Sequence, residues 1–337
     1  MSDDEVIVMA DGGGGGRTRE LLRTVILPAI DNPMLRGLDD AACIDRPAGN
    51  LVFTTDSFVV SPLFFPGGDI GRLAVCGTVN DLAMQGGRPL YLSLGLILEE
   101  GLRVGDLRRI MRSLGETAKE AGVMVVTGDT KVVERGARNG IYINTAGLGE
   151  RLSGVDTHVA NARPGDRVVV NGTLGDHGIA VMSVREGIRF ETELVSDAAP
   201  LGGMIGDLLA AVPGIHVLRD PTRGGVAAAL NDIAESSGVC VRLQEGAIPV
   251  RPEVRGACDL LGFDPLNVAN EGKAVIICAS QDVDAVLAAL RKHPLGADAC
   301  EIGEIVAAPA GRVLLHTKLG GERIVDVPSG EDLPRIC

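Results

Sequence analysis

Acidic residues recur at places where the sequence predicts that an apolar strand comes to an end. Asp56 follows LVFTT, Asp129 follows VMVVTG and Asp220 follows IHVLR, each beside small residues that let a ligand approach the backbone. Gathered carboxylates are costly unless a cation neutralises them, and such hard oxygen ligands suit Mg²⁺ carried with nucleotide phosphates. One aspartate of this kind is more often a turn former or a helix cap. Several in similar contexts favour a shared metal–phosphate site.

Two further aspartates extend this set, and no familiar nucleotide motif competes with it. Asp40 precedes the predicted strand AACI, and Asp81 interrupts an otherwise apolar helix. The pair Gly272-Lys273 lacks the leading glycine and the hydroxyl residue of a P-loop, and no GxGxxG follows a strand. The recurring aspartates are therefore the main indication of a phosphate site.

Two side chains are candidates for moving a proton at such a site. Lys131 comes directly after Asp129 and Thr130, where a titratable amine can do what arginine cannot. Glu271, in NVANEGK, stands at the entrance of the predicted strand AVIIC. For each residue a solvated surface side chain is the commoner role, so the pattern alone leaves both alternatives open.

The chain ends in PSGEDLPRIC, a polar segment that we expect to be mobile, with Cys337 as its last residue. Ten residues at up to ~3.3 Å each can extend for tens of ångströms, enough to enter a cleft. The 7 cysteines form no CxxC pair, which disfavours a zinc ribbon or a disulfide framework. Six lie in apolar contexts typical of buried thiols. The terminal thiol is either an accident of composition or the carrier of a covalently attached group.

Strands and helices alternate along the chain, which predicts an α+β or α/β protein. A length of 337 residues suggests two mixed α/β domains, which we expect to face each other with a cleft between them. The polar, proline-bearing stretch SGVDTHVANARPGD is the expected boundary. Residues 75–83 and 226–234 also share an Asn-Asp pair within an apolar helix. This similarity suggests related domains, although two ordinary amphipathic helices would explain it equally well.

Composition excludes several classes of function. The 32 basic residues are outnumbered by 45 acidic ones, and a net charge of −13 opposes electrostatic binding to nucleic acid. No apolar run approaches the ~20 residues that span a bilayer. The N-terminus has neither the basic region nor the long apolar region of a secretory signal. We therefore expect a cytoplasmic protein that binds neither nucleic acid nor a membrane.

The motifs CGTVNDLAMQGG, VTGDTKVV, DPTRGG and NEGK, with the terminal PRIC, resemble the HypE family of hydrogenase maturation factors, the carbamoyl dehydratases of nickel–iron hydrogenase assembly. The similarity covers the chain from about residue 12. The aspartate-bearing motifs are shared with aminoimidazole ribonucleotide synthetase, selenophosphate synthetase and thiamine monophosphate kinase. The resemblance implies a homodimer with four segments: a flexible glycine-rich N-terminus (1–16), an ATP-binding and dimerisation domain (17–155), a C-terminal α/β domain (156–327) and a mobile tail (328–337).

The resemblance also implies a reaction. The carbamoyltransferase HypF would place a carbamoyl group on Cys337, ATP would phosphorylate its oxygen, and loss of phosphate and a proton would leave a thiocyanate. The cyanide would pass to iron carried by a HypC–HypD complex. Lys131 and Glu271 stand at the matching catalytic positions, and which of them takes the proton is open. ATP and Mg²⁺ would be held by Asp40, Asp56, Asp81, Asp129, Thr130 and Asp220, with the five aspartates as metal ligands.

Two alternative functions remain open. A small-molecule ATP-dependent kinase or ligase of the same superfamily would use the aspartates but not the tail. A non-catalytic scaffold would dock maturation partners, and its aspartate sites would be degenerate. Selenophosphate synthesis is disfavoured, because the segment DGGGGGRTRELL lacks the catalytic cysteine or lysine found there in those enzymes.

Overall fold

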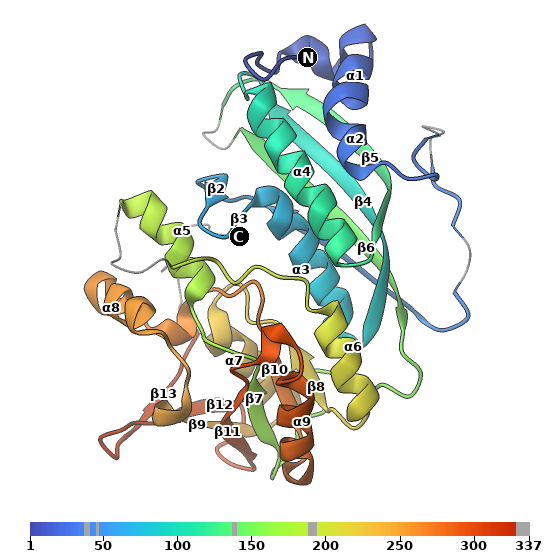
Figure 1. The fold of residues 1–337 in the computed structure, drawn as a ribbon. Helices are drawn as coiled ribbons and strands as arrows, with labels where there is room; N and C mark the ends of the chain where they lie inside the picture. Colours follow the sequence, from blue (N-terminus) through green and yellow to red (C-terminus); the bar gives the residue numbers. More distant parts are fainter. Residues whose placement is uncertain (37–40, 45–46, 137–139, 188–193, 328–337) are drawn as a thin grey trace.

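The computed structural model describes residues 1–36, 41–44, 47–136, 140–187 and 194–327 (Figure 1). Two predicted site residues, Asp40 and Cys337, lie outside these ranges, as does the whole predicted tail 328–337. The elements up to residue 151 are η1 (Met9–Gly12), α1 (Gly16–Leu21), η2 (Leu22–Ile26), α2 (Leu27–Ile30), β1 (Leu51–Phe58), β2 (Phe64–Phe65), β3 (Gly68–Asp69), α3 (Ile70–Met84), β4 (Gly87–Glu99), α4 (Val104–Glu120), β5 (Met124–Val133) and β6 (Ile141–Arg151).

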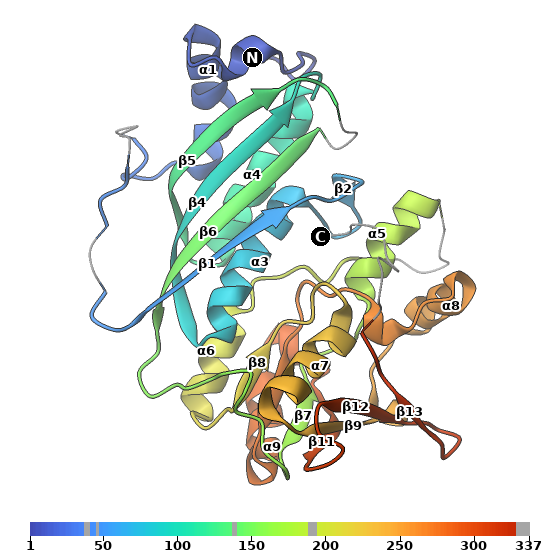
Figure 2. The ribbon, with the colours of Figure 1, turned by 180° about the vertical axis from the view of Figure 1, so that it is seen from behind.

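A four-stranded sheet forms the centre of this first part. Its strand order is β1-β6-β4-β5, with β4 and β5 parallel and the other neighbours antiparallel. Helices α3 and α4 cover one face, and no helix of the described chain lies on the opposite face (Figure 2). Along β4, Leu92, Leu94, Leu96 and Leu98 are at most 3% exposed, whereas Ile97 on the opposite face is 44% exposed. Such alternation is typical of a sheet that is covered on one side.

The second part of the chain is built on a larger sheet. Its elements are β7 (Arg167–Val170), α5 (Asp176–Glu186), α6 (Gly202–Ala211), β8 (Val217–Arg219), α7 (Gly225–Ser237), β9 (Cys240–Gln244), η3 (Glu245–Ala247), α8 (Pro252–Leu261), η4 (Pro265–Asn267), β10 (Val275–Cys278), η5 (Ser280–Asp282), α9 (Val283–Leu290), η6 (Pro294–Gly296), β11 (Cys300–Val306), β12 (Arg312–His316) and β13 (Glu322–Ile324). The seven strands follow the order β13-β12-β9-β11-β7-β10-β8, with β12 and β9 parallel and the other neighbours antiparallel.

Both faces of this second sheet are covered, in contrast to the first. Val168 and Val170 of β7 pack in one core with α7, and Val169 packs in another with α6 and α9. A strand that is buried on both sides needs apolar residues at consecutive positions, which explains runs such as VVV and VIIC. Both parts thus mix helices with a sheet, which confirms the predicted mixed α/β class.

Some predictions about local structure were wrong. Residues 41–44 lie outside any strand, and the predicted strand AACI is absent there. Asp129 does not follow a strand end, because β5 pairs with β4 in register as far as Val133. The helices α6 and α8 and the strand β11 were not predicted. Of the six cysteines expected in the core, Cys43 is exposed and Cys300 is half-buried.

The two parts of the chain meet along α3. This helix packs against β1 and β6 of its own sheet and against α6 and β8 of the second part. Asp81 lies near its C-terminal end, and Asp220 directly follows β8. The junction therefore brings residues that are distant in sequence to one place. No helix in the described ranges has the length and apolar character needed to cross a bilayer.

Candidate functional site

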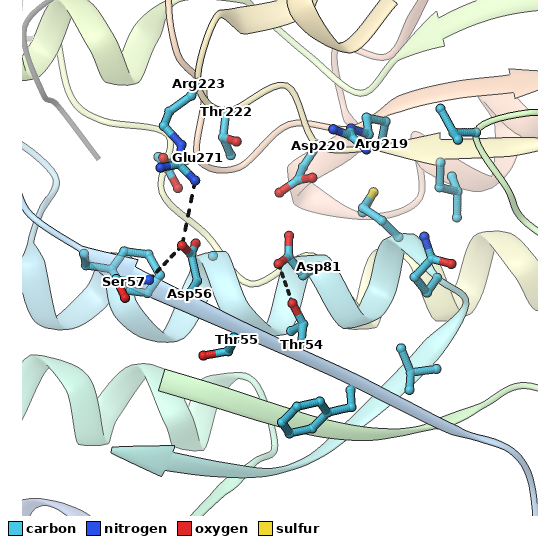
Figure 3. A pocket seen from close by; sticks show the side chains of 18 residues that line it. Thr54, Thr55, Asp56, Ser57, Asp81, Arg219, Asp220, Thr222, Arg223 and Glu271 are labelled. Atoms are coloured by element: carbon cyan, nitrogen blue, oxygen red, sulfur yellow. Dashed lines mark hydrogen bonds and ion pairs between the residues drawn. The ribbon is translucent and has the colours of Figure 1, made fainter. Parts of the chain in front are cut away.

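A pocket of about 400 Å³ lies at the junction, between β1, α3 and the chain segment that follows β8. Four acidic side chains line it: Asp56, Asp81, Asp220 and Glu271 (Figure 3). Its volume falls in the range of ~300–1,000 Å³ typical of small-molecule sites. The structure therefore brings together four of the residues predicted from the sequence.

Residues of β1 orient the two carboxylates of the first part. The Thr54 hydroxyl donates a hydrogen bond to Asp81 Oδ2 at 2.9 Å, and the Ser57 amide donates to Asp56 Oδ1 at 2.8 Å (Figure 3). Side chains alternate along a strand, so Thr54 and Asp56 point towards α3 while Thr55 and Ser57 lie on the opposite, exposed face. The strand thus supplies one carboxylate to the pocket, Asp56, and a hydroxyl that orients a second, Asp81.

The carboxylates of the pocket are desolvated and repel one another. Burial raises the pKa of Asp56 and of Asp81 above the usual range of an aspartate. Burial and the neighbouring charge of Asp81 together raise the pKa of Asp220 to about 7. Carboxylates that are this close and this poorly solvated become more stable when a cation joins them.

A metal ion in this pocket would need coordinating atoms from water or a bound molecule in addition to those of the protein. Within the described residues, no group of three or more His, Cys, Asp or Glu side chains is arranged to hold a metal ion. Mg²⁺ seldom needs such a cage, because it binds one or two carboxylates and completes its octahedron with water and phosphate oxygens. The hard oxygens and raised pKa values of Asp56, Asp81 and Asp220 fit a magnesium ion that arrives with a nucleotide.

We predict that Asp220→Asn stabilises the ligand-free protein at pH 8. The pKa of about 7 in the folded state exceeds the ordinary value of 3.8. The stability that a protonated Asp220 gives the folded protein is fully present below pH 3.8, the ordinary pKa of the group. This stability is lost as the pH rises through about 7, its pKa in the folded protein. Asparagine removes this loss, so the melting temperature should rise by several degrees at pH 8 and by much less at pH 5.

The matched control for this prediction is Asp207→Asn, which removes an exposed carboxylate from α6. Thermal unfolding without metal or nucleotide should show no comparable pH-dependent gain for this variant. An Asp220→Asn effect of the same size at both pH values would contradict the prediction.

The predicted residues Asp129, Thr130 and Lys131 do not line this pocket. They lie on β5, at the edge of the sheet opposite β1. The strand register places Ser57, Asn144 and Asp129 in one row across the sheet. With three strand spacings between β1 and β5, this row is ~14 Å long. Within one chain, the predicted site is therefore divided between two edges of the sheet.

Lys131 and Asp129 form an ion pair on the exposed face of the sheet. Lys131 Nζ lies 2.9 Å from Asp129 Oδ2, and the two side chains are 65% and 69% exposed. The hydrogen bond from Lys131 lowers the pKa of Asp129. Asp129 is thus paired closely with a cation of its own strand, and its pKa is shifted in the opposite direction to those of the pocket aspartates.

Glu271 reaches the pocket from the second part of the chain. It lies in the loop before β10 and is only 3% exposed. Its backbone amide donates a hydrogen bond to Asp197 Oδ1 at 3.0 Å. Its side chain lies beside Thr222 and Arg223 (Figure 3). Of the two candidate bases, Glu271 is the one that lines the pocket of the same chain.

Arg223 is a pocket residue that sequence reasoning missed. Its Nη2 lies 3.9 Å from Asp56 Oδ1, and its side chain is 74% exposed. The turn that presents it requires glycine, because Gly225 has φ +61° and a Cβ there would lie 2.4 Å from the carbonyl oxygen of Leu266. The available signal was the arginine of DPTRGG, which directly precedes two glycines and stands three residues after an aspartate. A guanidinium among carboxylates can bind a phosphate.

The chain is similar to known proteins over both of its parts. Residues 38–151 match a family model described as AIR synthase related protein, N-terminal domain, and residues 163–316 match the C-terminal domain of the same family. The chain is 53% identical over 332 residues to the carbamoyl dehydratase HypE of Cupriavidus necator, covering 98% of this chain and 95% of that protein. It is 46% identical over 336 residues to that of Escherichia coli, covering 98% and 99%.

Solved structures show the same similarity. HypE in complex with ATP matches with a TM-score of 0.94 and 47% identity, covering 98% of this chain and 99% of that one. A chain of a HypE–HypF complex matches with a TM-score of 0.80 and 47% identity, covering 93% and 100%. The similarity therefore extends over both parts of the chain and across the pocket between them.

Proposed function

Because this chain belongs to the HypE family of carbamoyl dehydratases, we propose that it uses ATP to convert a carbamoyl group on its own terminal cysteine, Cys337, to a thiocyanate. It is an ATP-dependent enzyme of hydrogenase maturation. The observation that supports the proposed reaction best is the pocket, in which Asp56, Asp81 and Asp220 meet Glu271 across the junction of the two parts.

The reaction requires the carbamoyl oxygen to become a leaving group. The oxygen attacks the γ-phosphorus of ATP, the bond from that phosphorus to ADP breaks, and one N–H proton goes to a base. The carbon–oxygen bond then breaks, the second N–H proton leaves, and the carbon–nitrogen bond becomes a triple bond. The balance is one S-carbamoyl group and ATP giving one thiocyanate, ADP, phosphate and a proton.

The pocket supplies side chains for each part of this chemistry. Asp56, Asp81 and Asp220 would hold Mg²⁺, which when bound neutralises the phosphate charge. Glu271 would accept a proton from the carbamoyl nitrogen. Arg223 would bind the transferred phosphate, since it is paired with Asp56 only at 3.9 Å and so can move to a stronger partner.

We expect Arg223→Gln to slow phosphate release from the carbamoylated protein by about tenfold or more, because a charge-assisted bond to phosphate is lost. Arg312→Gln is the matched control, since Arg312 also has a loose ion pair, 3.8 Å from Asp326, but lies on β12. Release of phosphate under saturating ATP measures the effect. Equal rates in the Arg223 variant and the wild type would contradict this role.

We infer that a second copy of the chain supplies Lys131 to the pocket. The uncovered face of the first sheet carries apolar side chains that are unusually exposed, including Phe53 at 69%. A two-fold contact through this face that brings β5 of one copy next to β1 of the other would carry Asp129, Thr130 and Lys131 to the pocket of its partner. In this arrangement segment 17–155 dimerises, and segment 156–327 completes the pocket.

The proposed reaction also involves two partners and two further parts of this chain. HypF would add the carbamoyl group to Cys337, and a HypE–HypF complex is among the similar structures. The HypC–HypD complex would accept the cyanide on its iron. Asp40 and the tail 328–337, which lie outside the described residues, would join the site as an additional ligand and as the arm that carries the substrate.

The decisive experiment compares the purified protein before and after carbamoylation by HypF. With ATP and Mg²⁺, phosphate release should occur only in the carbamoylated sample, and mass spectrometry should show that the C-terminal peptide has lost one water. Phosphate release that is the same in both samples would favour a kinase or ligase acting on a small molecule. ATP binding without phosphate release in either sample would favour the scaffold.

A further inference from the structure

We propose that Asn80 is a positioning residue for the dehydration, holding Glu271 of the second part in register with Asp81 of the first. This inference rests on the proposed function, because it concerns how the base of that reaction is placed. Asn80 and Asp81 are consecutive residues of α3. Asp81 lines the pocket, and Asn80 is hydrogen-bonded to the backbone of Glu271 on the opposite wall.

The three hydrogen bonds of the Asn80 side chain all cross the junction. Its Nδ2 donates to the carbonyl oxygens of Ala199, at 3.1 Å, and Glu271, at 3.2 Å. Its Oδ1 accepts from the amide of Leu201 at 2.7 Å. The residue is only 2% exposed, so water cannot replace these bonds. A helix of the first part is thereby bonded to two segments of the second part through one amide.

A second residue, Asp197, holds the other backbone group of Glu271. Asp197 Oδ1 accepts the hydrogen bond from the Glu271 amide at 3.0 Å, and Asp197 Oδ2 lies 3.0 Å from Lys273 Nζ. Burial acts to raise the pKa of Asp197, but Lys273 and His177 outweigh it, and the pKa stays below its usual range. The carboxylate is therefore ionised, and its hydrogen bond to the Glu271 amide is charge-assisted.

Asn80 and Asp197 are themselves connected by segment 196–201, which we call the junction strap. The strap contains Asp197 and two partners of Asn80, Ala199 and Leu201. Arg72 of α3 also donates to the Ala198 carbonyl of the strap at 2.7 Å. Contact with the Glu271 loop is so close that a Cβ at Gly272 would lie 1.9 Å from the Asp197 carbonyl oxygen. Only glycine fits there, so the loop cannot shift along the strap without a clash.

This arrangement determines where Glu271 lies relative to the proposed metal–phosphate site. Both backbone groups of Glu271 are bonded, the amide to Asp197 and the carbonyl to Asn80. Loss of either bond lets the Glu271 side chain move while Asp56, Asp81 and Asp220 stay in place. Displacement of a reacting group by ~1 Å can cost about 100-fold in rate. ATP binding, which depends on other side chains, should change little.

The experiment measures the dehydration rate and ATP affinity of Asn80→Ala in the full-length carbamoylated protein. Single-turnover thiocyanate formation should fall by about 100-fold. The dissociation constant for ATP should change by less than about threefold, so that the loss lies in the chemical step rather than in binding. Asp197→Asn loses the Lys273 ion pair and weakens the hydrogen bond to the Glu271 amide while keeping an acceptor oxygen, so it should show the same split with a smaller loss of rate. Should Asn80→Ala fail to fold, Asn80→Ser and Asp197→Asn carry the same test.

The matched control is Asn231→Ala, because Asn231 occupies the corresponding place in the similar motif on α7. Its Nδ2 also makes two hydrogen bonds to carbonyls, of Ala227 and Val325, each at 2.8 Å. The melting temperature of the Asn231→Ala variant should fall like that of Asn80→Ala, while its dehydration rate stays at the wild-type value. A purely structural role for Asn80 would instead make the two variants behave alike.

Three outcomes distinguish a failure of the positioning role of Asn80 from a failure of the proposed function. Wild-type protein that does not dehydrate its carbamoylated tail would overturn the proposed function and this inference with it. An active wild type with an equally active Asn80→Ala variant would overturn the inference alone. The double variant of Asn80→Ala and Asp197→Asn should lose much less activity than the product of the two single losses, because both residues hold the backbone of Glu271. Full additivity would contradict the shared role.

Discussion

Cys337→Ala is expected to abolish thiocyanate formation while leaving ATP binding at the wild-type level. In the proposed reaction the terminal sulfur carries the substrate, and alanine offers no atom to which HypF could attach a carbamoyl group. The nucleotide would still meet the pocket carboxylates, none of which lies in the tail. Mass spectrometry of the C-terminal peptide and titration with ATP measure the two effects separately.

Cys43→Ala is the control for the terminal cysteine. Cys43 is an exposed free thiol, so its loss tests whether any accessible cysteine can serve. We expect normal carbamoylation and normal thiocyanate formation in this variant. If Cys337→Ala released phosphate from ATP as fast as the carbamoylated wild type, the tail would not be the substrate, and a small-molecule reaction would be the better explanation.

Mixed dimers give the second large effect. Lys131→Ala and Asp81→Asn should each be inactive, since one removes a catalytic candidate and the other a metal–phosphate ligand. Co-expressed with different tags and purified through both, they should recover about half of the wild-type activity, because one of the two pockets then combines an intact Asp81 with the partner's intact lysine. Single-turnover thiocyanate formation per dimer measures the recovery.

The control is a mixed dimer in which each chain lacks a different aspartate of its own pocket. A mixed dimer of Asp56→Asn and Asp81→Asn contains no intact pocket in either arrangement, so its activity should stay at background. Background activity in the Lys131→Ala and Asp81→Asn dimer as well would mean that Lys131 serves the pocket of its own chain or none. Such a result would contradict the dimer contact through the uncovered sheet face.

Several features of the fold and the site follow from local sequence patterns. The alternation along β4 determines which face of the sheet is buried, because successive side chains of a strand point to opposite sides. The runs VVV and VIIC indicate strands that are covered on both faces. Asp56, Asp81 and Asp220 stand out because a carboxylate within or next to an apolar segment is expensive without a partner. Local chemistry alone thus identified the three aspartates of the pocket.

Other features depend on strand order and register, which no local pattern contains. Asp56 and Asp129 have the same type of sequence context, yet β1 and β5 are opposite edges of one sheet. The junction of α3 with β8 decides that Asp81 and Asp220 share a pocket. Arg223 and Asn80 gained their importance only from neighbours that lie far away in the sequence.

The sequence by itself therefore identified the candidate metal ligands and bases, since residue type and local burial are properties of short segments. Tertiary structure decided which of them act together. It placed Glu271 with three aspartates and placed Lys131 at a distance, because long-range strand pairing and the buried contacts of the junction set these positions. The division of the proposed site between two edges of one sheet is the consequence that only the folded chain reveals.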